Sequence, residues 1–153
     1  MEQEILVESY NAVSRRHGFL ARDQNSAWLY LHEPSGDPNR SAPVEFTGFA
    51  FSQIPPIKKS EVHEFRPSPP PIVNSFASEC AICENSDDYI WELAWSTDGQ
   101  SIAVHRNGEP WCFITPNAPY GYSRAISIDG PWGKPWCSES FSQTDWVPRE
   151  NAR

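Results

Sequence analysis

The clearest pattern along the chain is an alternation of apolar and polar positions interrupted by two turn dipeptides. The alternation runs through three segments rich in β-branched and aromatic residues: 90–95, 101–106 and 111–114. Asp98-Gly99 separates the first two segments, and Asn107-Gly108 separates the last two. Both dipeptides readily adopt the positive φ angles that tight hairpins require. The pattern therefore predicts a meander of three antiparallel strands over residues 89–115.

The first residues of the chain follow a helical period instead. The apolar stripe consists of Leu6, Tyr10, Val13 and His17, spaced by four, three and four residues. Glutamates lie near the start of this segment and basic residues near its end, which matches the helix dipole. Gly18 is suited to the position just past a helix end. We therefore expect a helix over residues 2–17, packed on one face of the sheet.

A period of two returns after residue 26 and predicts two further strands. In the first, Trp28, Tyr30 and His32 alternate with Leu29 and Leu31. The second covers residues 44–52 and shows the same alternation. A cluster of turn residues at 33–39 lies between them. These two strands are expected to pair as a hairpin with a long connection.

Prolines dominate the segment 54–73, where residues 55, 56, 67 and 69–71 are all proline. Proline lacks a backbone N–H and interrupts helices and central strands, so we expect neither here. Residues 66–71 are expected to be polyproline-like. We interpret the segment as a surface crossing between two parts of the sheet. The alternative is a ligand for an aromatic-lined groove.

The C-terminal part of the chain mixes one short apolar segment with irregular sequence. Residues 125–128 predict a fourth strand after the meander. Residues 129–153 combine Gly, Pro and Ser with Trp132, Trp136, Phe141 and Trp146, which predicts an irregular aromatic wrap. A chain of 153 residues suits one core. The predicted fold is a single α+β domain over residues 1–153: an N-terminal helix on a mainly antiparallel sheet, a Pro-rich crossing and an aromatic C-terminal segment.

The formal net charge of −8 narrows the choice of partners. A nucleic-acid surface needs clustered Lys and Arg, and adjacent basic residues occur at 15–16 and 58–59 alone. We therefore expect no nucleic acid and a preference for basic proteins. No positively charged segment precedes an apolar core at the N-terminus, and no apolar run reaches about 18 residues. A cytoplasmic chain without a membrane segment is expected.

Cys80 and Cys83 are the one pair of residues in the chain whose spacing has a known chemical meaning. Two thiolates separated by two residues can share a zinc ion, with Cys112 and Cys137 completing a tetrahedral set. Neither of these later cysteines belongs to a second such pair, and a buried cysteine is an ordinary small apolar residue. We expect free thiols and no cofactor. A small zinc-binding or enzymatic domain that uses Cys80 and Cys83 is the alternative.

The sequence contains no recognisable catalytic motif. The four histidines are scattered, no glycine-rich phosphate loop is present, and no nucleophile is grouped with a base. We therefore expect a protein that is not an enzyme. Acidic loop residues and large aromatic side chains are suited to binding a protein partner. The candidate partner-binding residues are Glu84, Asp87, Asp88, Asp98, Tyr120, Tyr122 and Trp132.

Two resemblances bear on these expectations. Residues 93–114, LAWSTDGQSIAVHRNGEPWCFI, resemble one blade of a TolB-type β-propeller, but the pattern is not repeated and implies no propeller. In size, acidity, its seven tryptophans and its lack of catalytic motifs, the chain resembles the immunity proteins of bacterial toxin–immunity pairs. That resemblance implies an inhibitor that occludes the active site of a cognate toxin. A small-ligand or carbohydrate-binding module is a further alternative, because Trp and Tyr also stack on sugars.

Overall fold

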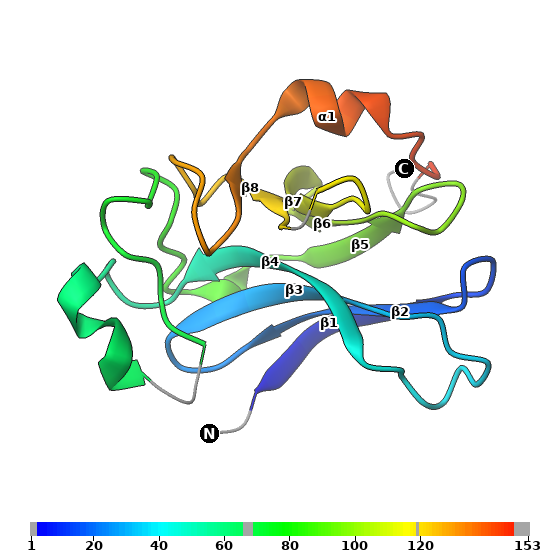
Figure 1. Ribbon diagram of the computed structural model, residues 1–153, viewed down its shortest axis with the longest axis horizontal. Coiled ribbons are helices and arrows are strands. Elements are labelled where there is room, and N and C mark those ends of the chain that lie inside the picture. Colours follow the sequence, from blue (N-terminus) through cyan, green and yellow to red (C-terminus); the bar gives the residue numbers. More distant parts are fainter. Residues whose placement is uncertain (1–2, 66–68, 119, 149–153) are drawn as a thin grey trace.

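Two β-sheets face each other in the computed structural model, which describes residues 3–65, 69–118 and 120–148 (Figure 1). The first sheet contains β1 (Glu4–Asn11), β2 (Arg16–Arg22), β3 (Ser26–His32) and β4 (Val44–Ser52). The second contains β5 (Trp91–Trp95), β6 (Ile102–Arg106), β7 (Glu109–Ile114), β8 (Tyr122–Ser123) and β9 (Lys134–Pro135). Three short helices complete the described part: η1 (Lys59–Phe65), η2 (Ser86–Asp88) and α1 (Ser138–Gln143).

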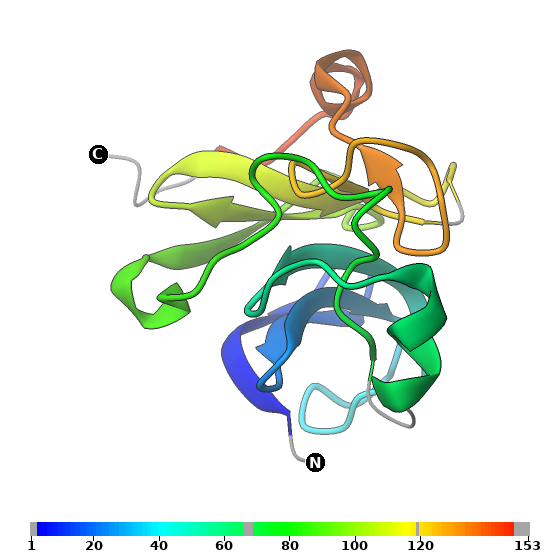
Figure 2. The same ribbon diagram turned by 90° about the vertical axis from the view of Figure 1, so that its left-hand side faces the viewer.

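In both sheets the strands are hydrogen-bonded in the order in which they occur in the chain. All neighbouring strands are antiparallel except β8 and β9, which run parallel. Figure 1 shows α1 over the outer side of the second sheet, and Figure 2 shows η1 beside the first sheet. The fold is therefore mostly β. The predicted antiparallel sheet is confirmed, but the predicted α+β class is wrong.

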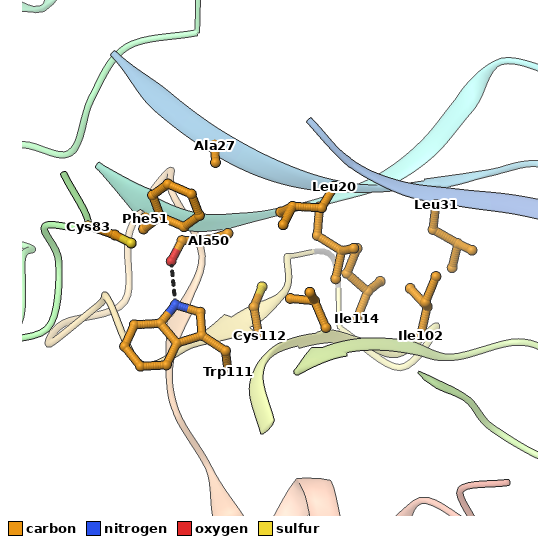
Figure 3. Close-up of a cluster of buried hydrophobic side chains, with 12 residues drawn as sticks. Leu20, Ala27, Leu31, Ala50, Phe51, Cys83, Ile102, Trp111, Cys112 and Ile114 are labelled. Carbon is orange, nitrogen blue, oxygen red and sulfur yellow. Dashed lines mark hydrogen bonds between the residues drawn. The ribbon is translucent and has the colours of Figure 1, made fainter. Parts of the chain in front are cut away.

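The main core lies between the two sheets. Leu20 and Leu31 point from the first sheet towards Ile102 and Ile114 of the second (Figure 3). These four side chains and Leu29 are fully buried. In β3 and β6, alternate residues supply this core because successive side chains of a strand point to opposite faces. Burying such side chains contributes roughly 1.5–3 kcal/mol each relative to exposure.

One hydrogen bond crosses the main core and joins the two sheets. The indole Nε1 of Trp111 in β7 donates to the carbonyl oxygen of Ala50 in β4 at 2.8 Å (Figure 3). The Trp111 side chain is 2% exposed, and the Arg106 guanidinium lies 3.8 Å from the centre of its ring. Trp111 thus combines a large apolar contact with a satisfied polar group.

A second apolar cluster lies under the long connection between β4 and β5. Ile57, Ile72 and Val73 of this connection pack with Phe49 of β4 and with Trp132. The backbone N–H of Phe49 donates to the carbonyl oxygen of Trp132 at 3.3 Å. The Pro-rich crossing and the C-terminal segment are therefore part of the packed structure.

The predicted helix over residues 2–17 is wrong, because this segment forms the β1–β2 hairpin. The side-chain oxygen of Asn11 accepts hydrogen bonds from the backbone N–H groups of Val13 and Ser14, both at 2.9 Å. Arg15 then adopts a φ of 63°, in the left-handed region. Such an Asx turn followed by a left-handed residue reverses the chain and excludes a continuous helix.

The remaining strand predictions have mixed outcomes. The meander is confirmed as β5, β6 and β7, and β3 pairs with β4 as the expected hairpin. The fourth strand of this sheet was expected at 125–128 but is β8, at Tyr122–Ser123. Within 125–128, Ile126 instead makes a single isolated bridge, to Ala77.

Helices occur where the sequence predicted none. The Pro-rich crossing contains η1, whose residues lie between two groups of prolines, and the C-terminal wrap contains α1. Of the predicted polyproline segment, residues 66–68 lie outside the described residues. In the described part of the chain, none of the helices has the length and apolar character needed to span a bilayer.

Candidate functional site

An acidic groove opens where β1 begins and β2 ends, and it has a volume of about 430 Å³. It is lined by Glu4, Arg22, Asp23, Gln24, Gln53, Glu84 and Asp87. These residues come from the start of β1, the β2–β3 turn, the chain just after β4 and the loop around η2. The groove is therefore a product of the tertiary structure, and we refer to these seven residues as the acidic groove.

Arg22 organises the acidic groove from its base. Its guanidinium donates to Glu4 Oε1 at 2.8 Å, to Asp87 Oδ1 at 2.8 Å and to the hydroxyl of Ser86. Burial lowers the pKa of Arg22, but the hydrogen bonds and charges of Glu4 and Asp87 outweigh this effect and raise the pKa overall. One arginine thus ties the first sheet to η2 while remaining charged.

The acidic groove carries a net negative charge. Its four carboxylates, less one guanidinium, leave a charge of −3. Asp23 is buried and holds the β2–β3 turn by accepting from the backbone N–H groups of Asn25 and Ser26. Glu84, by contrast, is exposed, and its carboxylate makes no hydrogen bond or ion pair with the described residues. The groove therefore presents unneutralised negative charge to solvent.

The structure brings together three of the seven predicted binding residues. Glu84 and Asp87 line the acidic groove, and Asp88 is exposed beside them on η2. Asp98 lies elsewhere: its turn approaches Asn11, at the opposite end of β1. The length of β1 separates the two places by roughly 23 Å, at about 3.3 Å per residue.

The three predicted aromatic anchors lie outside the acidic groove. Tyr120 is 45% exposed. Tyr122 is half-buried, with its ring stacked on Phe113 at 4.7 Å. Trp132 is 7% exposed, because it packs against Phe76 and donates through Nε1 to the Pro70 carbonyl at 3.4 Å. Trp132 is therefore buried in the second apolar cluster, and its role in binding a partner stays a prediction.

Asp98 has a clear local role in the β5–β6 turn. Its carboxylate accepts hydrogen bonds from the Ser96 hydroxyl at 2.6 Å and the Gln100 backbone N–H at 3.0 Å. These hydrogen bonds, that of Ser96 first, lower the pKa of Asp98. Through these contacts, Asp98 is a structural residue of the β5–β6 hairpin.

The lowered pKa of Asp98 predicts a pH-dependent contribution to stability. A carboxylate with a lowered folded-state pKa stabilises the fold above its unfolded pKa, about 3.9, and loses this effect as the pH falls through the folded value. Asp98→Asn should therefore lower the free energy of unfolding at pH 7, by no more than about 1 kcal/mol at this exposed site. Urea titrations of both proteins should converge at low pH. A constant difference across the whole pH range would contradict the assignment.

The four cysteines do not form a common site. Cys83 and Cys112 are buried in the main core, where burial raises the pKa of both thiols. Cys80 is exposed. The Cys137 sulfur accepts from the Ser140 backbone N–H at the start of α1, and hydrogen bonds from Ser140 lower its pKa. Among residues 3–65, 69–118 and 120–148, no three His, Cys, Asp or Glu side chains are grouped to hold a metal ion.

Sequence reasoning missed the half of the acidic groove that comes from the first sheet. Glu4 was assigned to a helix, and Arg22 was given no role. A signal was available in Arg22-Asp23-Gln24-Asn25, a polar run between two alternating segments. Such a run indicates a hairpin turn, with its charged side chains at the sheet end.

The described structure thus defines a two-sheet β protein with an acidic groove at one end of its strands. No protein-family model matches the chain, and no curated protein or solved structure matches it either. The function is therefore inferred from the site itself.

Proposed function

We propose that this chain is a non-enzymatic inhibitor that binds a basic segment of another protein in its acidic groove. The observation that supports this most directly is the net charge of −3 in a groove whose base is fixed by Arg22. A cationic side chain that enters such a groove can make charge-assisted hydrogen bonds to carboxylates. The resemblance in type to immunity proteins suggests the consequence, which is occlusion of the active site of a cognate bacterial toxin.

The carboxylates in and beside the acidic groove are proposed to have two different roles, one structural and one in binding the partner. Glu4 and Asp87 hold Arg22, and this pairing positions η2 against the first sheet. The carboxylates of Glu84 and Asp88 are exposed and make no hydrogen bond or ion pair with the described residues, so they are free to meet a partner. Complementary charge of this kind mainly accelerates association.

A charge-reversal experiment tests this proposal. The partner is first isolated by affinity capture and its own activity is identified. The double variant Glu84→Lys/Asp88→Lys should then lower the association rate constant about ten-fold at low salt, with a smaller change in dissociation. Added chain should inhibit the partner stoichiometrically, and the double variant should need a higher concentration. Surface plasmon resonance at two salt concentrations measures both rates.

The matched control is Glu64→Lys/Glu79→Lys, which changes the net charge by the same amount. Both residues are exposed and lie outside the acidic groove. This control should retain most of the association rate. Equal slowing by the two double variants would mean that total charge, and not the groove, attracts the partner. No slowing by either would refute the proposed site.

A further inference from the structure

The outer face of the first sheet carries a row of aromatic rings. Along this row, the ring centres of Tyr10 and His17 are 4.6 Å apart, those of His17 and His32 6.5 Å, those of His32 and Phe19 5.1 Å, and those of Phe19 and Tyr30 5.0 Å. The intervening residues of the same strands supply the main core. An antiparallel sheet that faces solvent normally carries polar residues on its outer side, so this row needs an explanation.

A groove of about 500 Å³ lies at one end of this row. We refer to it as the aromatic groove, defined by Glu8, Tyr10, His17, Phe19, Pro38 and Asn39. The β1–β2 register places Glu8 opposite Phe19 and Tyr10 opposite His17. Because these four residues share one face of the hairpin, the Glu8 carboxylate lies beside the rings of Tyr10, His17 and Phe19.

Pro38, Asn39 and Ser41 of the β3–β4 connection, residues 33–43, form one wall of the aromatic groove. This connection lies on the side of the first sheet away from the second (Figures 1 and 2). His17 Nε2 lies 2.8 Å from the Pro38 carbonyl oxygen, and the Tyr10 hydroxyl donates to the Ser35 carbonyl at 3.3 Å. A carbonyl only accepts, so His17 Nε2 carries the proton in this contact. Tyr10 and His17, two of the three aromatic residues that line the groove, therefore also hold its wall in place.

The chemistry of the aromatic groove favours a cation. Among the described residues, its lining includes the carboxylate of Glu8 and neither lysine nor arginine. Arg40 is exposed and lies between two lining residues, but it does not line the groove itself. The faces of Tyr and Phe rings attract cations, and a nearby carboxylate adds to this attraction.

The ring geometry distinguishes a cation from a sugar. The ring planes of Tyr10 and His17, which both line the groove, are tilted by 52° relative to each other. Rings inclined in this way form the walls of a pocket and offer no flat platform on which a pyranose could lie. A compact, weakly hydrated cation can contact several inclined rings at once.

We propose that the aromatic groove between β1, β2 and residues 38–39 binds a small organic cation with an alkylated nitrogen. Glu8 supplies the neutralising charge, and Tyr10, His17 and Phe19 supply the ring contacts. This site is separate from the acidic groove, so it stands whether or not a protein partner binds there.

Choline and its neutral carbon isostere, dimethylbutanol, test the proposal, because they share a shape and differ in charge. In NMR titrations at about pH 8, choline should shift signals of Tyr10, His17 and Phe19. A Kd of the order of 1 mM is expected, with dimethylbutanol at least ten-fold weaker. Glu8→Gln should weaken choline binding about ten-fold.

Glu109→Gln is the matched control, since Glu109 is an exposed glutamate in the second sheet. It should leave the affinity for choline unchanged, and both variants should retain the unfolding transition of the parent chain. Equal affinity for choline and dimethylbutanol would overturn the proposal in favour of an apolar pocket. The absence of shifts up to about 100-fold above the expected Kd would show that there is no site.

Discussion

Trp111→Ala is expected to destabilise the fold by about 3–5 kcal/mol. The substitution removes a ring that is 2% exposed and leaves a cavity between the two sheets. It also removes the 2.8 Å hydrogen bond to the Ala50 carbonyl and the ring beneath Arg106. Chemical unfolding monitored by far-ultraviolet circular dichroism measures the loss. A change below about 1 kcal/mol would mean that Trp111 does not hold the sheets together.

Trp111→Phe separates the hydrogen bond from most of the packing. A smaller loss of about 1–2 kcal/mol is expected, because the Ala50 carbonyl keeps a second donor in the Ser123 hydroxyl at 3.4 Å. Trp136→Phe is the control, since Trp136 is half-buried on the outer face of the second sheet. This control should change the free energy of unfolding by less than about 1 kcal/mol.

Gly121→Ala is expected to cost about 1–3 kcal/mol, because Gly121, just before β8, approaches β4 so closely that there is no room for a methyl group. A Cβ atom at this position would lie 2.9 Å from the Gly48 Cα of β4 and 3.1 Å from the Phe113 carbonyl oxygen of β7. Both neighbours are backbone atoms, so relief requires movement of a strand. The backbone N–H of Gly121 also donates to the Thr47 carbonyl at 3.1 Å, and this bond fixes its position.

Gly36→Ala is the matched control for Gly121→Ala, because no atom lies within 4 Å of a Cβ at position 36. It should leave the midpoint of urea unfolding nearly unchanged. If both substitutions shift the midpoint equally, the close approach of Gly48 and Gly121 does not restrict the packing of the two sheets.

The meander was predictable because its signals are local. Gly99, Asn107 and Gly108 all adopt positive φ angles, at 71°, 49° and 84°. These are the conformations that Asp-Gly and Asn-Gly dipeptides favour at hairpin turns. Each strand pair in the meander is thus specified by residues within a few positions of its turn.

The N-terminal hairpin was not predictable from spacing alone. Leu6, Tyr10 and His17 recur at helical intervals, yet they belong to two strands. The side chains of Tyr10 and His17 meet on the outer face of the hairpin, whereas the adjacent Gly18 faces Ile102 in the core. The decisive local feature is the Asx turn at Asn11, which is weaker as a signal than a glycine or proline turn.

Only the loop that contributes to the acidic groove was predictable, because only this part has a local signal in the sequence. The loop with Glu84, Asp87 and Asp88 is acidic in sequence and exposed in the structure. Its counterpart, formed by Glu4 and Arg22, lies more than 60 residues away in the chain. Composition can identify an acidic loop, but only the tertiary structure shows which arginine neutralises part of it.

The order of the strands has a consequence for how this chain folds. Since sequential neighbours pair throughout both sheets, each ladder forms by closing the loop between two consecutive strands. Contacts between the two sheets, by contrast, join residues that are far apart in the sequence. The hydrogen bond from Trp111 to Ala50 spans 61 residues. Local pairing is fast, and contacts of high sequence separation are slow. The formation of contacts between the two sheets is therefore expected to limit the rate of folding.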